Sequence, residues 1–155
     1  MDKVFLTILG LTEKPDSKKK INQIIEGYGY PYEKHYYETE DGYINMVVRI
    51  SGRSFYLGLM KIGHKGSINR ENIANGGPKR PVVILQHGLL DSCAGWILNG
   101  SYSLAFLLAD LGYDIWMNNS RGNRYSRQHT MLDPDNDEHK PLFWDYSFEE
   151  MAKYD

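Results

Sequence analysis

The sequence predicts an α/β fold in which a β-hairpin precedes a parallel strand–helix–strand unit. Residues 33–50 contain two runs rich in tyrosine, valine and isoleucine on either side of Asp41-Gly42, a dipeptide that favours a tight hairpin turn. Residues 82–86 are a continuous apolar run that indicates a buried strand, and a helical stretch at 103–111 and a second strand at 113–118 follow. Strand, helix and strand in this order, with few residues between them, indicate a parallel pair.

Three segments have helical patterns. The first begins near residue 21, and the second, at 103–111, has leucines on one side and ends at Gly112. The third begins at Ser147, which forms a capping box with Glu150. The apolar positions that define the first two helices are Ile21, Ile24 and Ile25, and Leu104, Leu107, Leu108 and Leu111.

The chain of 155 residues has the length of one domain, and 41% hydrophobic residues are enough for a core. We expect residues 1–20 to be a separate N-terminal segment that is either signal-like or disordered. Its start, MDKVFLTILGL, resembles the apolar part of a secretory signal but lacks an Ala-x-Ala cleavage site, so a short strand or helix is the alternative. Residues 61–79 have the glycine-rich composition of a variable loop.

Composition excludes several classes of function. With 18 basic and 20 acidic side chains and no basic block, the chain is not expected to bind nucleic acid. No apolar run reaches the length of about 20 residues that spans a bilayer.

The single cysteine, Cys93, cannot form an intrachain disulfide. Residues 133–137 resemble the start of a calcium loop, but Glu138 replaces its glycine, so we expect no metal and no cofactor.

The end of the first parallel strand is the candidate site. His87-Gly88 follows the strand at the carboxyl edge of the sheet, where open α/β sheets bind ligands. A glycine there allows a sharp turn and leaves the next backbone N–H groups free to bind an oxyanion. An ordinary structural turn is the alternative reading.

Several long segments of the chain resemble the acid lipases, the gastric and lysosomal lipase family of α/β-hydrolases. The similarity covers the amino-terminal region of that family and runs in register from about residue 21 to 155, except near 61–79. It implies an incomplete α/β-hydrolase fold over 21–155. The segments are GYPYEKHYYETEDGYI, RPVVILQHGLLDSCAGWI, SLAFLLADLGYDIWMNNSRGNRYSR and FWDYSFEEMAKYD.

The resemblance also implies roles for individual residues. The HGLL segment corresponds to the oxyanion-hole loop, with the backbone N–H of Leu89 as one donor and His87 and Gly88 setting the shape of the loop. The turn after the next strand corresponds to a segment that holds this loop in place, and it contains Asn119, Arg121 and Gly122. A surface cation is the alternative for Arg121.

The nucleophile of such a hydrolase is absent from these residues. No Gly-x-Ser-x-Gly segment occurs, and in the family it follows the helix that begins at Ser147. Cys93 is a poor substitute because no histidine can be paired with it. We therefore expect the amino-terminal portion of a serine lipid-ester hydrolase, secreted or lysosomal by resemblance and catalytically incomplete as given. The alternative is a truncated, non-catalytic paralogue that binds a protein partner at an exposed sheet edge.

Overall fold

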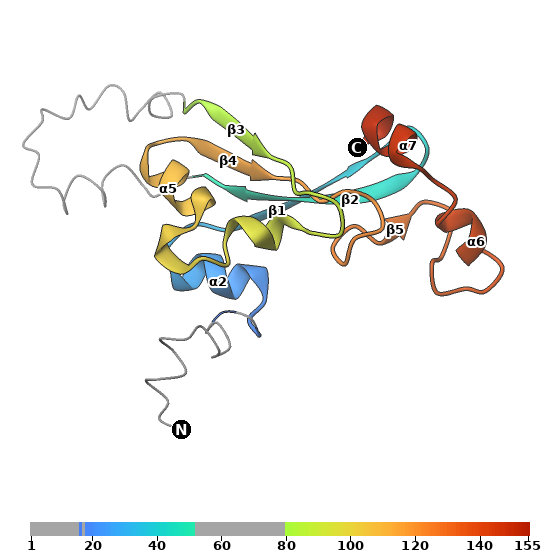
Figure 1. The fold of residues 1–155 in the computed structure, drawn as a ribbon, viewed down its shortest axis with the longest axis horizontal. Helices are drawn as coiled ribbons and strands as arrows, with labels where there is room; N and C mark the ends of the chain where they lie inside the picture. The colour runs from blue at the N-terminus through green and yellow to red at the C-terminus, as the bar shows by residue number, and fades with distance from the viewer. Residues whose placement is uncertain (1–15, 17, 52–79) are drawn as a thin grey trace, which may run out of the picture.

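The computed structural model describes residue 16 and residues 18–51 and 80–155 (Figure 1). The helices and strands of these residues are, in chain order, α2 (Ile21–Gly27), β1 (Glu33–Glu38), β2 (Tyr43–Ile50), β3 (Val82–Leu85), the 3-10 helices η1 (Cys93–Trp96) and η2 (Gly100–Tyr102), α5 (Leu104–Asp110), β4 (Asp114–Met117), β5 (Gln128–His129), α6 (Lys140–Phe143) and α7 (Phe148–Tyr154).

The strands form one mixed sheet in the order β1-β2-β4-β3, and β5 pairs with β2. The pairs β1–β2 and β2–β4 are antiparallel, whereas β3 and β4 are parallel with Val82 opposite Asp114 and Leu85 opposite Met117. The predicted α/β class and the parallel pair are therefore confirmed.

The predicted hairpin is also confirmed. Its turn spans residues 39–42, and the Thr39 N–H donates to the Tyr43 carbonyl over 2.8 Å. Gly42 has a φ of 91°, and an added Cβ would lie 2.7 Å from Thr130 Oγ1. Glycine is required at this position for both reasons.

Helix α5 of the parallel unit buries a different side from the one that the sequence predicts. In α5 the buried residues are Ala105, Phe106 and Ala109, and the Phe106 ring stacks on Tyr30 with ring centroids 4.6 Å apart. The leucine side was expected to be the apolar face of this helix, yet Leu104, Leu107 and Leu111 are exposed. The small side chains of the two alanines let the helix approach the sheet, which leaves the longer leucines on its outer side.

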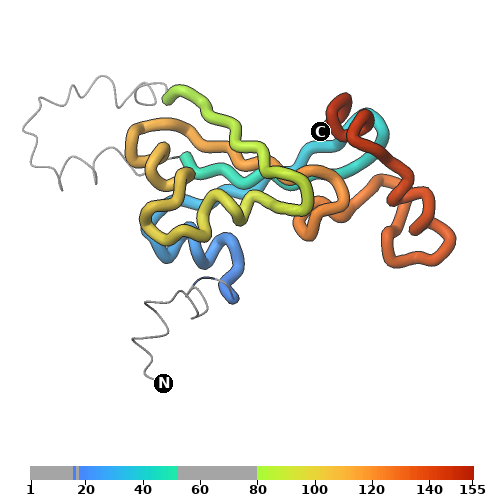
Figure 2. The backbone as a smooth tube through the Cα atoms, in the orientation of Figure 1, coloured from blue at the N-terminus to red at the C-terminus, as the bar shows by residue number. Residues whose placement is uncertain are grey.

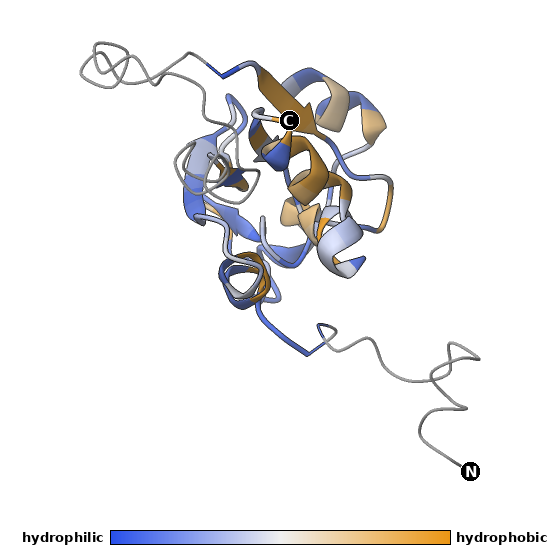
Figure 3. Ribbon diagram, turned by 90° about the vertical axis from the view of Figure 1, so that its left-hand side faces the viewer, coloured by the Kyte–Doolittle hydropathy of each residue, from blue (hydrophilic) through white to orange (hydrophobic). Residues whose placement is uncertain are grey.

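Strand β3 lies at the end of the sheet order, and its other edge pairs with no strand among the described residues. Val82 and Ile84 are 60% and 71% exposed, although Leu85 is buried. The interpretation of 82–86 as a fully buried strand is therefore wrong for the described residues. Figure 3 shows β3, which follows the grey trace, as hydrophobic over its length.

The core lies between the sheet and the layer formed by α2, η1 and α5. Figures 1 and 2 show these helices on one side of the sheet, and α6 and α7 near the end that carries the β1–β2 turn. The isoleucine face predicted for the first helix is buried in this core. The largest fully buried apolar side chains are Phe106, Phe143, Ile25, Ile50, Ile97, Ile115, Met117 and Val48.

Two predictions concern segments that lie mostly or wholly outside the described residues. The variable loop at 61–79 and nearly all of the segment at 1–20 lie outside the described residues. Among the residues that are described, no helix is long and apolar enough to cross a membrane.

Candidate active site

A cavity of about 860 Å³ lies at the carboxyl end of the parallel strand pair. One wall is the loop that follows β3 (residues 86–92), and a second is the turn that follows β4 (residues 120–124). The carboxyl-terminal segment closes the third side with Trp144, Tyr146, Phe148, Met151, Ala152 and Asp155. This is the edge of the sheet at which the sequence places its candidate site.

Leu89 lies on the wall of this cavity. None of the described residues accepts a hydrogen bond from its backbone N–H. The whole residue is 66% exposed. The N–H of Leu90 also has no acceptor among the described residues, and the two N–H groups after it are used: Asp91 N–H donates to the Gly88 carbonyl, and Ser92 N–H donates to Asp91 Oδ1. Ser92 then caps η1. The loop therefore has backbone donors without acceptors at residues 89 and 90, and η1 begins only after them.

The backbone conformation of the loop differs from the one that the sequence suggests. The left-handed residue is Leu90, with a φ of 60°, and not Gly88. A leucine in this conformation is strained by roughly 1–2 kcal/mol. Apart from the two neighbouring residues in the chain, a Cβ added at Gly88 would meet no heavy atom within 4 Å, so there is open space at this position.

His87 connects the two loops. Its Nδ1 lies 2.7 Å from the Gly88 carbonyl oxygen, and its Nε2 lies 3.1 Å from both the Ser120 backbone N and Asn123 Nδ2. The loop after β3 and the turn after β4 are therefore joined through one side chain.

Asn119 is fully buried, and both the oxygen and the nitrogen of its side-chain amide have hydrogen-bond partners. Its Oδ1 accepts from the Cys93 N–H at 3.0 Å and from Asn123 Nδ2 at 3.0 Å, and its Nδ2 donates to the Met46 carbonyl at 2.9 Å. It joins the start of η1 and strand β2 to the turn that holds His87.

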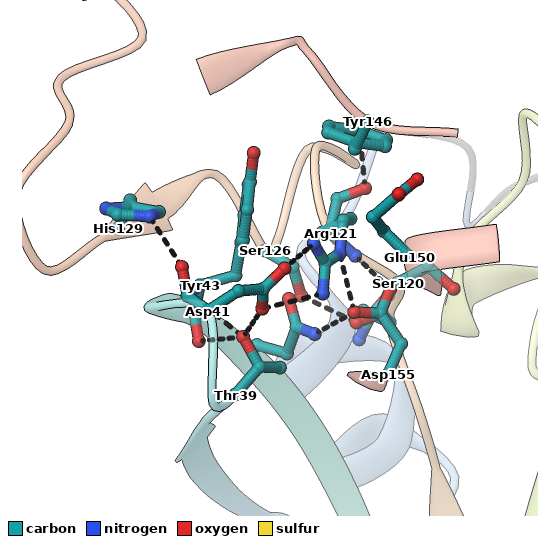
Figure 4. Close-up of polar contacts among 12 residues, drawn as sticks. Thr39, Asp41, Tyr43, Ser120, Arg121, Ser126, His129, Tyr146, Glu150 and Asp155 are labelled. Atoms are coloured by element: carbon teal, nitrogen blue, oxygen red, sulfur yellow. Dashed lines mark hydrogen bonds and ion pairs between the residues drawn. The ribbon is translucent and has the colours of Figure 1, made fainter. Parts of the chain in front are cut away.

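Arg121 is not a surface cation, because its side chain has no exposed area. Its Nε donates to Asp155 Oδ1 at 2.8 Å, and its two terminal nitrogens donate to the carboxylate of Asp41 (Figure 4). The guanidinium carbon lies 4.1 Å from the centre of the Tyr43 ring. The arginine thus joins the hairpin turn, the turn after β4 and the carboxyl-terminal residues.

Burial, hydrogen bonds and charge in this cluster shift the pKa values of Asp41 and Tyr43. Burial acts to raise the pKa of Asp41, but the hydrogen bonds from Arg121 and Thr39 and the arginine charge outweigh it and lower that pKa. Burial raises the pKa of Tyr43 to about 12. The cluster is a charged structural clamp beside the cavity.

Gly122, the last residue predicted to support the loop, is restricted by its neighbours. Its φ is 76°, and an added Cβ would lie 2.0 Å from the hydroxyl oxygen of Tyr146. That hydroxyl donates to the Arg121 carbonyl at 3.2 Å. A side chain at 122 would therefore separate the turn from the carboxyl-terminal segment.

The structure gives no support to Cys93 as a nucleophile. Cys93 is fully buried, and burial raises the pKa of its thiol to about 11. Among the described residues no group of three or more His, Cys, Asp or Glu side chains is arranged to hold a metal ion.

Sequence reasoning missed the partners of the predicted residues. Asp41 and Asp155 pair with Arg121 across 80 and 34 residues of chain. Asn123 lies four residues from Asn119, and its Oδ1 accepts from the Tyr125 and Ser126 N–H groups. Asp41 was assigned only to the hairpin turn, and no local pattern indicated its second role.

Comparison of the sequence with known proteins identifies the family of this chain. Residues 21–100 match the model of the partial alpha/beta-hydrolase lipase region. Gastric triacylglycerol lipase of Rattus norvegicus is 47% identical over 142 residues, which are 91% of this chain and 31% of that protein. Lysosomal acid lipase/cholesteryl ester hydrolase of Homo sapiens is 44% identical, covering 91% and 30%. The chain spans about a third of the length of the curated relatives that it matches.

Proposed function

This chain belongs to the alpha/beta-hydrolase lipase family, and we propose that it is the amino-terminal portion of a hydrolase of lipid esters. The proposed reaction is acyl transfer to a serine followed by hydrolysis of the acyl-enzyme, and it requires no cofactor. Two relatives are named for triacylglycerol and cholesteryl ester, so carboxylic esters of lipids are the proposed substrate class.

The observation that carries the proposal is that the Leu89 N–H has no acceptor among the described residues and that Leu89 is one of the residues lining the cavity. When a nucleophile attacks an ester carbonyl, negative charge develops on the carbonyl oxygen. A fixed N–H that faces this oxygen stabilises the transition state without reorganisation, and removing one such donor costs about 10²–10³ in kcat by precedent.

The rim of the cavity suits an apolar substrate. Leu90 is 99% exposed and Phe148 is 64% exposed, and both line the cavity together with Leu89 and Met151. Apolar side chains that are exposed beside an oxyanion donor can bury the acyl chain of an ester while its carbonyl meets the N–H.

The remaining catalytic groups are absent from these residues. The 155-residue sequence has no Gly-x-Ser-x-Gly segment, so the serine, its histidine and its acidic partner must come from additional sequence. One donor supplies a rate enhancement of about 10²–10³, whereas acyl-transfer enzymes need a rate enhancement of roughly 10⁶ or more. We therefore expect residues 1–155 alone to have no esterase or lipase activity above background.

A second candidate function rests on the edge of β3 that pairs with no strand among the described residues. An apolar edge strand with Val82 and Ile84 exposed is suited to pairing with another strand. In a non-catalytic paralogue this strand would come from a partner protein, and the chain would act as an interaction module.

A chimera distinguishes the two functions. Residues 21–155 replace the matching segment of the rat gastric lipase, and the chimera is assayed on a short-chain ester and a triacylglycerol emulsion beside the isolated 155-residue chain. The proposal predicts activity in the chimera and none in the isolated chain. A folded, inactive chimera would favour the interaction module, and turnover by the isolated chain that survives Cys93→Ala would contradict the serine mechanism.

A further inference from the structure

We propose that His87 is a positioning residue whose neutral ring, protonated on Nδ1, fixes the orientation of the peptide that carries the Leu89 N–H. The catalytic meaning of this inference rests on the proposed function, but the state of the ring can be measured without any enzymatic assay. The inference is argued from the hydrogen bonds of His87 and of the groups around it.

Two contacts define the protonation state of the ring. The Gly88 carbonyl oxygen, 2.7 Å from Nδ1, can only accept a hydrogen bond, so Nδ1 carries the proton. The Ser120 backbone N–H, 3.1 Å from Nε2, can only donate, so Nε2 has a free lone pair. Only the neutral ring with hydrogen on Nδ1 satisfies both partners.

Asn123 supports the same assignment. Its Oδ1 accepts from the backbone N–H groups of Tyr125 at 2.8 Å and Ser126 at 3.1 Å, which fixes the orientation of the amide. Its Nδ2 therefore faces His87 Nε2 at 3.1 Å and Asn119 Oδ1 at 3.0 Å. Two donors point at Nε2, so a hydrogen on that atom would oppose both.

The bond to Gly88 determines where the next N–H points. In a trans peptide the carbonyl and the following N–H point in opposite directions, and no cis peptide occurs in the described chain. The Gly88 carbonyl is held by His87 Nδ1 and by the Asp91 N–H at 3.2 Å. Rotation of this peptide would break both bonds, and the Leu89 N–H is consequently fixed on the side away from them.

The primary test is the 15N NMR spectrum of the His87 ring in the 155-residue chain, in weakly alkaline buffer. We expect Nδ1 to resonate as a protonated nitrogen and Nε2 as an unprotonated one. The opposite tautomer, or an averaged spectrum of two tautomers, would overturn the inference whatever the activity of the protein.

Two substitutions separate the two ends of the ring. In His87→Gln the side-chain oxygen can replace Nε2 as acceptor, whereas in His87→Asn the amide nitrogen can replace Nδ1 as donor. Hydrogen exchange at the Ser120 N–H should be about fivefold faster in His87→Asn than in His87→Gln, because only the former loses that bond. Equal exchange in the two folded variants would contradict the assignment of Nε2.

The same pair in the chimera tests positioning. We expect His87→Gln to lower kcat by about tenfold to a hundredfold with KM unchanged, and His87→Asn to recover most of the loss. Equal kcat in both folded variants would refute positioning. If the ring has the expected tautomer but the unsubstituted chimera is inactive, the proposed function fails and the assignment of the ring stands.

Discussion

Replacing Arg121 by methionine should destabilise the fold by about 4–6 kcal/mol. The change removes a guanidinium with no exposed area and leaves the carboxylate of Asp155, only 5% exposed, without its ionic partner. Breaking a buried ion pair on one side costs about 3–5 kcal/mol. Asp41, whose side chain is 27% exposed, can regain some hydration, so its share is smaller. The lost contact with the Tyr43 ring, 4.1 Å from the guanidinium carbon, adds about 1 kcal/mol.

The assay is urea unfolding followed by the fluorescence of the three tryptophans. Because domains of this size are stable by about 5–15 kcal/mol, the variant should unfold at a much lower urea concentration with a similar m value. Arg127→Met is the matched control. It breaks an arginine–aspartate pair whose side chains are 41% and 72% exposed, so its effect should be below about 1 kcal/mol. If Arg121→Met and Arg127→Met were equally stable, the claim that the ion pairs of Arg121 stabilise the fold would be refuted.

Acid should destabilise the folded chain below about pH 4. The carboxyl groups of Asp41 and Asp114 have a lowered pKa, the latter through its hydrogen bonds from Arg49, so below about pH 4 the unfolded chain binds more protons than the folded one. The free energy of unfolding should be constant just above that pH and fall below it, and a flat profile down to pH 2 would contradict the lowered values. Gly122→Ala should cost about 2 kcal/mol or more, since φ is 76° and Tyr146 occupies the space. Gly88→Ala, where the space is open, should change stability by less than about 1 kcal/mol. If thermal unfolding showed Gly88→Ala to be less stable than Gly122→Ala, both predictions would be contradicted.

Elements with a strong local signal could be predicted from the sequence. Asp41-Gly42 specifies the hairpin because few residues other than glycine tolerate its left-handed turn. The parallel pair follows from the order of the apolar runs, which the crossover geometry constrains. The position of the cavity follows from the same order, because ligands bind at the carboxyl edge of such strands.

Features that depend on distant contacts could not be predicted. The leucine stripe of α5 is apolar in the sequence, but the sequence does not show that the alanine and phenylalanine side would pack on the sheet. The apolar run of β3 does not reveal that, within residues 18–51 and 80–155, only one of its edges is paired. The role of Arg121 was implied by resemblance, whereas its partners Asp41 and Asp155 are brought together only by the fold.

The most direct test of the account is the replacement of the Leu89 N–H itself. In the chimera, Leu89→Pro removes the backbone donor, whereas Leu89→Ala keeps it and removes only the side chain. The account predicts that kcat for a short-chain ester falls by about 10²–10³ in Leu89→Pro and remains close to the unsubstituted value in Leu89→Ala. A folded Leu89→Pro protein that keeps the kcat of the unsubstituted chimera would contradict the claim that this N–H stabilises the oxyanion.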